Sequence, residues 1–354
     1  MKHTRLFAGL SVAILAAAVA GPVAAQSPSA PAAGGQYVIG VSNTTIGNGW
    51  RDEMICSIKA QALVSGQVAS LNIQSRNTDA TGQLEDIRNL ISAGVDAIII
   101  NPVDPNAIND AIKEATDAGI KVVTVDQGVT EPSAYLMSND QEAYAYMGAK
   151  WLFEHLNGKG AVVYMGGVAG TGADSDRKAG FERARAEFPD ITVAAETQTD
   201  WQFPKGKQQM LDLLASGLQI DGVWTSGIDY TITEAFQEAG QPIPPIVGAD
   251  GSEFVQQLVT IPDFTGALVT NPASVGGAGV TLALKLLNGE TAEPVTKFTP
   301  VLFENATDEG KAALAAAADP SVPKTWPIGI FVPDWTTYTK EQILPGTGCK
   351  GPGE

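Results

Sequence analysis

Short runs of β-branched residues alternate with helical segments along most of this chain, and this alternation constrains the fold more than any other feature. The first runs stand at residues 37–41, 70–73, 97–100 and 121–125. Strand starts therefore recur roughly every 25 to 32 residues, the rhythm of right-handed βαβ units with parallel strands covered by helices on both faces.

The segments between these strands carry apolar residues at steps of three and four, which predicts helices at 51–64, 82–93 and 105–118. Gly94 and Gly119 stand where such helices normally stop. A second series of strands is expected at 161–164, 192–194, 222–224 and 245–248. Since the chain is longer than one hydrophobic core usually serves, the prediction is an α/β protein with two doubly wound parallel-sheet lobes.

The first 25 residues have the order of a secretory signal peptide: Lys2 and Arg5, an apolar stretch at 6–20, then small residues up to Ala25. Cleavage is expected near Ala25, leaving a flexible leader at 26–36. An uncleaved membrane anchor is the alternative, but the apolar stretch is shorter than the roughly 20 residues that span a bilayer. No cysteine lies near the cleavage site to carry a lipid. The mature protein is expected in the periplasm or outside the cell.

The net charge and the two cysteines limit the classes of partner and cofactor that the sequence is compatible with. The formal charge is −17, and it becomes more negative once Lys2 and Arg5 leave, so neither nucleic acid nor an anionic membrane surface is an expected partner. Cys56 and Cys349 are the two cysteines of the whole sequence. In an oxidising compartment they are predicted to pair, although two unpaired thiols are the alternative. Their spacing excludes a local zinc motif or a redox pair, and no metal or cofactor is expected.

Polar residues and glycines follow the predicted strands, where open parallel sheets bind their ligands. They are Asn43, Asn101, Asp126 with Gln127, Gly166 with Gly167, Ser226 with Gly227, Asp250 with Gly251, and Asn271. For Asn43, Asn101 and the glycines, turns or helix caps are the simpler interpretation. Asp126 and Asp250 each end an apolar strand, which favours a binding role over capping.

A neutral sugar is bound by carboxylates, amides, a guanidinium fork and aromatic plates, and these residue types recur here. Trp50 and Trp201 stand in polar surroundings, which favours exposed rings that stack on a sugar. Trp224 continues a strand and is equally compatible with the core. Arg177 is either a ligand contact or a solvated helix residue.

The chain resembles the ribose-binding-protein-like periplasmic sugar-binding family over about residues 37–299. The matching sequence motifs lie at residues 97–102, 125–127, 138–140, 170–181 and 247–251. The resemblance implies the substrate-binding subunit of an ATP-binding-cassette sugar importer, with two lobes joined by a multi-crossing hinge near 138–140 and 270–272. It implies an N-terminal lobe of residues 37–138 plus 271–299 and a C-terminal lobe of residues 139–270. Residues 300–354 are expected to pack back on the lobes as an extension with a helix at 307–318.

The family's ligand positions carry over to this sequence one at a time. They fall on Asn48, Trp50, Arg51, Asp126, Gln127, Arg177, Trp201, Asp229, Asp250 and Asn271. Three of them depart from the family pattern: Arg51 replaces an aromatic residue, Gln127 an arginine, and only Asp229 remains of an asparagine–aspartate pair. These departures imply that the ligand need not be ribose.

The sequence also bears on three other functions: an enzyme, a transcription regulator and a sensor. His155 is the only histidine outside the signal peptide, and no nucleophile elbow or phosphate-binding loop occurs, so an enzyme is not expected. A carboxylate-pair glycosidase remains an alternative. A sugar-responsive transcription regulator would need a basic DNA-binding domain ahead of the core, where this sequence instead has a signal peptide and an acidic charge balance. A sensor that presents sugar to a chemotaxis or quorum-sensing receptor stays open beside a transport protein that acts as a monomer.

Overall fold

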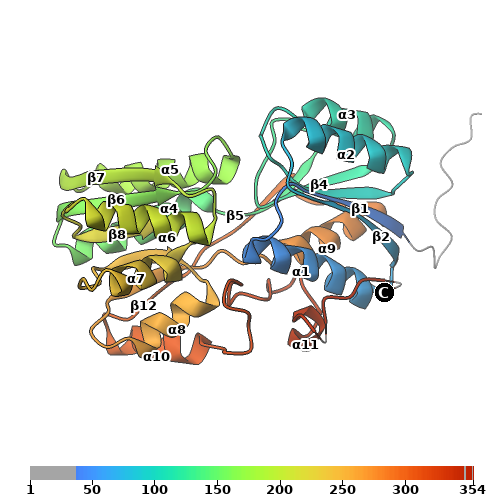
Figure 1. The fold of residues 1–354 in the computed structure, drawn as a ribbon. Helices are drawn as coiled ribbons and strands as arrows, with labels where there is room; N and C mark the ends of the chain where they lie inside the picture. Colours follow the sequence, from blue (N-terminus) through green and yellow to red (C-terminus); the bar gives the residue numbers. More distant parts are fainter. Residues whose placement is uncertain (1–36, 347, 353) are drawn as a thin grey trace, which may run out of the picture. The chain divides into compact units, whose positions relative to one another are not determined.

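The computed structural model describes residues 37–354 apart from 347 and 353, so the expected signal peptide and leader lie outside the described residues. Two six-stranded sheets organise this part of the chain (Figure 1). The first has the order β11-β5-β4-β3-β1-β2 and the second β12-β10-β9-β8-β6-β7. The predicted doubly wound α/β class is confirmed.

All strand pairs of the first sheet are parallel. Its strands are β1 (Tyr37–Asn43), β2 (Val68–Ser75), β3 (Ala97–Asn101), β4 (Lys121–Val125), β5 (Tyr135–Asn139) and β11 (Val295–Phe298). The helices α1 (Gly49–Ser65) and α9 (Val275–Leu287) pack together on one face, and α2 (Ala80–Ser92) and α3 (Asn109–Asp117) on the other (Figure 1). We call this unit the N-terminal lobe.

The second sheet, with its helices, is here called the C-terminal lobe. Its strands are β6 (Lys159–Gly166), β7 (Asp190–Gln198), β8 (Gly222–Thr225), β9 (Ile246–Ala249), β10 (Gly266–Val269) and β12 (Leu302–Glu304). Only β12 runs antiparallel to its neighbour among the described strand pairs. The helices α4 (Gln141–His155) and α5 (Gly172–Arg185) cover one face, while α6 (Phe203–Ala215), α7 (Asp229–Glu238) and α8 (Ser252–Thr260) cover the other.

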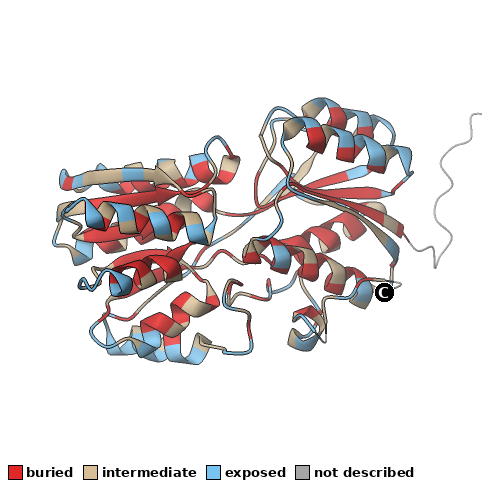
Figure 2. Cartoon of the chain, viewed as in Figure 1, coloured by how far each residue is buried: buried red, intermediate tan, exposed pale blue. Residues whose placement is uncertain are grey.

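The central strands of both sheets are buried on both faces, as their near-continuous apolar sequences require (Figure 2). Trp224 belongs to this interior, because it is fully buried and stacks on Tyr164 with ring centroids 4.8 Å apart. Gly94 and Gly119 end helices with φ of 70° and 86°, as predicted. The third helix begins at Asn109 instead of 105, because the Asp104 carboxylate accepts hydrogen bonds from the Asn106 and Ala107 amides in a turn before it.

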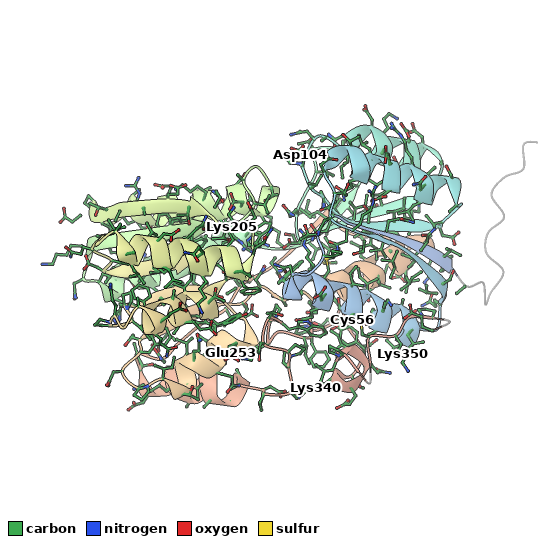
Figure 3. All side chains as sticks on the ribbon, in the orientation of Figure 1. Cys56, Asp104, Lys205, Glu253, Lys340 and Lys350 are labelled. Carbon is green, nitrogen blue, oxygen red and sulfur yellow. A yellow bond between two sulfur atoms is a disulfide. The ribbon has the colours of Figure 1, made fainter. Side chains whose placement is uncertain are left out.

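The described residues after β12 carry α10 (Asp308–Ala317) and α11 (Lys340–Ile343). We call residues 319–349 the C-terminal strap. It follows α10 on the C-terminal lobe and reaches α1 of the N-terminal lobe, where Cys349 is bonded to Cys56 (Figure 3). The Cα atoms of this pair are 4.5 Å apart, so the predicted disulfide is confirmed. In the part of the chain described here, no helix has the length and apolar character needed to cross a membrane.

Candidate functional site

A cavity lies at the carboxyl ends of strands from both sheets, where loops and helix starts of the two lobes meet. Most of its polar lining comes from positions that the sequence singled out. These residues are Asn48, Trp50, Arg51, Asp126, Arg177, Trp201, Asp229 and Asn271. Side chains from both lobes therefore face one space.

Asp126 and Arg177 are joined through a third residue, Gln141. Asp126 follows β4 with φ of 68°, a left-handed conformation that aspartate tolerates better than most residues. Its Oδ1 accepts a hydrogen bond from Gln141 Nε2 at 2.7 Å, and Gln141 Oε1 accepts one from Arg177 Nε at 2.9 Å. Arg177 also donates to Ser226 Oγ at 2.8 Å. The two charged groups are thereby fixed in orientation.

Burial dominates the electrostatics of this charged cluster. It lowers the pKa of Arg51 to about 10, although the charge of Asp126 works in the opposite direction. Burial also raises the pKa of Asp126, against the charges of Arg51 and Arg177. Because Arg51 and Asp126 are buried, hydrogen bonds that they make with a ligand are weakened little by bulk solvent.

Two indole rings face the cavity with their N–H groups engaged. Trp50 Nε1 donates to the Asn271 carbonyl at 2.7 Å, and Trp201 Nε1 donates to Ser226 Oγ at 3.1 Å. The Trp201 ring packs so closely on Gly167 that a Cβ there would lie 2.1 Å from the ring. The indole planes are held in place, which lowers the entropy cost of stacking a ligand on them.

Asn48 connects the two lobes. Its Oδ1 accepts the Arg51 amide and so caps α1, while its Nδ2 donates to the Trp201 carbonyl at 2.9 Å. One side chain thus begins a helix of the N-terminal lobe and contacts the second aromatic plate.

Two of the predicted ligand residues do not line the cavity. Gln127 turns toward Asn101, whose Oδ1 accepts from Gln127 Nε2 at 3.0 Å, and its Oε1 accepts the Ala173 amide of the C-terminal lobe at 3.1 Å. Asp250 is fully buried, and its Oδ1 accepts the Asn271 amide at 3.0 Å. Burial raises the pKa of Asp250 to about 6. Both residues therefore hydrogen-bond to other protein groups near the cavity and do not line it.

Asp229 lines the cavity but its oxygens are already engaged. Its Oδ1 accepts from the Thr225 hydroxyl and its Oδ2 from the Ala249 amide. Burial raises its pKa to about 7, against these hydrogen bonds. The group is therefore about half protonated near pH 7, and with both oxygens engaged it offers less to a ligand than Asp126 does.

Several lining residues were not predicted as ligand contacts. They are Thr45, Phe203, Tyr230, Phe254, Lys324, Thr325 and Pro327. Phe203 and Tyr230 have a signal in the sequence, because each stands within two residues of a predicted contact, Trp201 or Asp229. Gln141 likewise follows the strand β5 by two residues. No sequence pattern around residues 324–327 indicates that this part of the strap lines the cavity.

The donor set suits a polyhydroxylated ligand. It joins a carboxylate, guanidinium groups and amides to aromatic rings, the combination that satisfies both the hydroxyls and the apolar face of a sugar. Within residues 37–354, apart from 347 and 353, no cluster of three or more histidine, cysteine or acidic residues could hold a metal ion.

Comparison with known proteins gives concordant matches. A family model described as periplasmic binding protein domain matches residues 39–291. The xylitol-binding protein of Mycolicibacterium smegmatis is 31% identical over 65% of this chain and 68% of its own length. The ribose import binding protein of Bacillus subtilis is 26% identical over 82% of this chain and 95% of its own. The crystal structure of a transporter solute-binding protein from Thermobispora bispora superposes with a TM-score of 0.73 at 27% identity, covering 80% and 89% of the two chains.

Proposed function

Because the chain belongs to the periplasmic binding protein family, we propose that it captures a monosaccharide or polyol between its two lobes and delivers it to an ATP-binding-cassette importer. The names of two relatives, a xylitol-binding and a ribose import binding protein, support this class of ligand. The secretory signal expected from the sequence of residues 1–25 supports export before binding.

The observation that carries the proposal is the cavity itself. Trp50 from one lobe and Trp201 from the other supply aromatic surfaces, and the Asp126–Gln141–Arg177 chain supplies charged hydrogen-bonding groups beside them. In this proposal the carboxylate and guanidinium bind neighbouring hydroxyls while the rings stack on the sugar face. Asn48, Arg51, Asp229 and Asn271 complete the contacts.

A glycosidase finds less support than a binding protein. Its mechanism needs two carboxyl groups that face the scissile bond from opposite sides. Asp250 is buried and is not among the residues that line the cavity, and Asp229 has both oxygens engaged by Thr225 and Ala249. Asp126 is left as the carboxylate best placed to meet a ligand.

A thermal-shift screen of pentoses, hexoses and polyols tests the proposal, followed by calorimetry on the hits. A ligand that binds only the folded state raises the melting temperature, by an amount that grows with its concentration over Kd. We expect one subset of these compounds to stabilise the protein and to bind with one-to-one stoichiometry. Lack of stabilisation by every sugar and polyol at millimolar concentration would contradict the proposal. Loss of cellular uptake of the same compound on gene deletion tests delivery.

A further inference from the structure

Building on the proposed function, we propose that the C-terminal strap supplies a ligand-binding group, the Thr325 hydroxyl, and that Thr325 helps to decide which sugar or polyol is bound. This segment lies beyond residues 39–291, the part that the family model matches. The cavity is nevertheless lined by Lys324, Thr325 and Pro327.

The strap is built into the C-terminal lobe at the edge of the cavity. Helix α8 begins there without a side-chain cap, and the strap replaces one: Ser252 N donates to the Trp326 carbonyl at 2.8 Å and Glu253 N to the Lys324 carbonyl at 3.0 Å. Ile328 N donates back to the Asp250 carbonyl at 2.8 Å. These bonds on either side of Thr325 fix its backbone.

On its other side, Thr325 packs against the first residue of α1. A Cβ at Gly49 would lie 2.1 Å from Thr325 Oγ1 and 2.4 Å from the Thr325 carbonyl oxygen. Only glycine at this position leaves room for the strap. Since Asn48 and Trp50 flank Gly49, Thr325 lies beside two residues that line the cavity.

The Thr325 hydroxyl is available to a ligand. Among the described residues, its side chain makes no hydrogen bond, whereas Thr336 and Thr337 of the same strap are both bonded. A hydroxyl can donate one hydrogen bond and accept two, so it pairs with a sugar hydroxyl in either sense. The neighbouring Lys324 instead turns to Glu253, 3.5 Å away.

The rest of the strap holds Thr325 against the N-terminal lobe. Five side chains of the strap form a buried cluster with Cys56 and Ala60 of α1: Val322, Trp326, Ile330, Tyr338 and Ile343. The Tyr338 hydroxyl donates to the Ile330 carbonyl at 2.9 Å, and the disulfide closes the strap at Cys349. The strap is thus attached to both lobes, as a ligand contact between them requires.

The test compares Thr325→Val, which keeps the shape but removes the hydroxyl, with Thr325→Ser, which keeps the hydroxyl. The ligand is the strongest hit from the sugar and polyol screen, and the readout is Kd by calorimetry. We expect the valine variant to bind about fivefold to tenfold more weakly, as for the loss of one neutral hydrogen bond, and the serine variant to bind within about twofold of the parent. Thr260→Val, the same change at the exposed far end of α8, is the matched control and should leave Kd unchanged.

A further measurement separates ligand contact from a structural role. Monodeoxy analogues of the ligand should include one whose affinity is the same for the parent and Thr325→Val, because that analogue lacks the hydroxyl that Thr325 binds.

The outcomes are distinct. A parent protein that binds none of the compounds overturns both the proposed function and this inference. A parent that binds sugar with the same Kd as folded Thr325→Val overturns the inference alone. Equal losses for the valine variant with every deoxy analogue also overturn it, because they indicate a structural effect.

Discussion

The Arg177 side chain is held in place by contacts within the protein. Its guanidinium donates to Gln141 and Ser226 and lies 4.6 Å from the Tyr144 ring centre, so its position is fixed before a ligand arrives. A preorganised guanidinium loses little side-chain entropy on binding. At the residue scale, affinity should therefore depend strongly on this side chain.

Replacing Arg177 by alanine should weaken sugar binding by about 1.5 to 3 kcal/mol, the range for hydrogen bonds to a charged group. Calorimetry with the ligand from the screen measures the change. Arg185→Ala is the control, because Arg185 lies on the same helix but pairs with Glu182 at the surface. Parental affinity in a folded Arg177→Ala variant would remove this residue from the proposed site.

The buried carboxyl groups make stability depend on pH. Burial raises the pKa of Asp229 to about 7 and that of Asp250 to about 6. Both groups hold protons in the folded state that they lose in the unfolded chain above about pH 4. The folded state binds more protons between these values, so the free energy of unfolding should fall as pH rises from about 4 to 7.

Asp229→Asn tests this expectation by removing the titration while keeping the shape. The asparagine can accept from the Ala249 amide and donate to the Thr225 hydroxyl, so the fold should be kept. We expect the variant to lose less stability than the parent between pH 5 and pH 8, by about 1 to 3 kcal/mol. Urea unfolding at a series of pH values measures this. Parallel curves for parent and variant would contradict the raised pKa of Asp229.

At the scale of elements, the strap depends on a covalent bond as well as on packing. The disulfide closes a loop between residues 293 apart in sequence, nearly the whole described chain. Cross-linking so long a loop lowers the entropy of the unfolded chain. The strap also caps α8 and packs on α1, so loss of the bond should leave a folded but less stable protein.

The Cys56→Ser, Cys349→Ser double variant should unfold with a free energy about 2 to 5 kcal/mol lower than the oxidised parent. Denaturant titration measures the difference. The parent kept in reductant should match the double variant, which controls for the serine side chains. Equal stability of the oxidised parent and the variant would show that packing alone holds the strap.

At the scale of the whole molecule, we propose that binding closes the two lobes around crossings near 138–140 and 270–272. Hydrogen bonds that link the lobes beside the cavity include those from Asn48 to the Trp201 carbonyl, from Gln141 to Asp126 and from the Ala173 amide to Gln127. A ligand that contacts both lobes adds to these links and shifts the population toward the closed form.

Small-angle scattering tests closure directly. Saturating ligand should reduce the radius of gyration of the parent, because an open population is converted to the closed form. Arg177→Ala at a ligand concentration far below its own Kd serves as the control and should show no change. An unchanged radius in a parent whose binding is confirmed by calorimetry would contradict the hinge model.

The sequence by itself determined where β1 to β4 and β6 to β9 lie and at which ends of these strands the site is built, whereas β5, β10, β11 and β12 were not predicted. Strand and helix periods are local consequences of burial, so β1, β3 and β4 could be located from apolar runs alone. Parallel topology then places their carboxyl ends together, which located Asn101 and Asp126 at one edge of the first sheet. Two cysteines in an exported chain were enough to predict the disulfide.

The tertiary structure alone decided which side chains enter the cavity. Gln127 and Asp250 stand at predicted positions but do not line the cavity. Gln127 is hydrogen-bonded to Asn101 and to the Ala173 amide, and Asp250 accepts a hydrogen bond from the Asn271 amide. Thr325 lies 275 residues after Trp50 in the sequence, yet the strap brings it beside the start of α1. Side-chain direction depends on hydrogen-bond partners and packing from distant elements, and no local pattern carries that information.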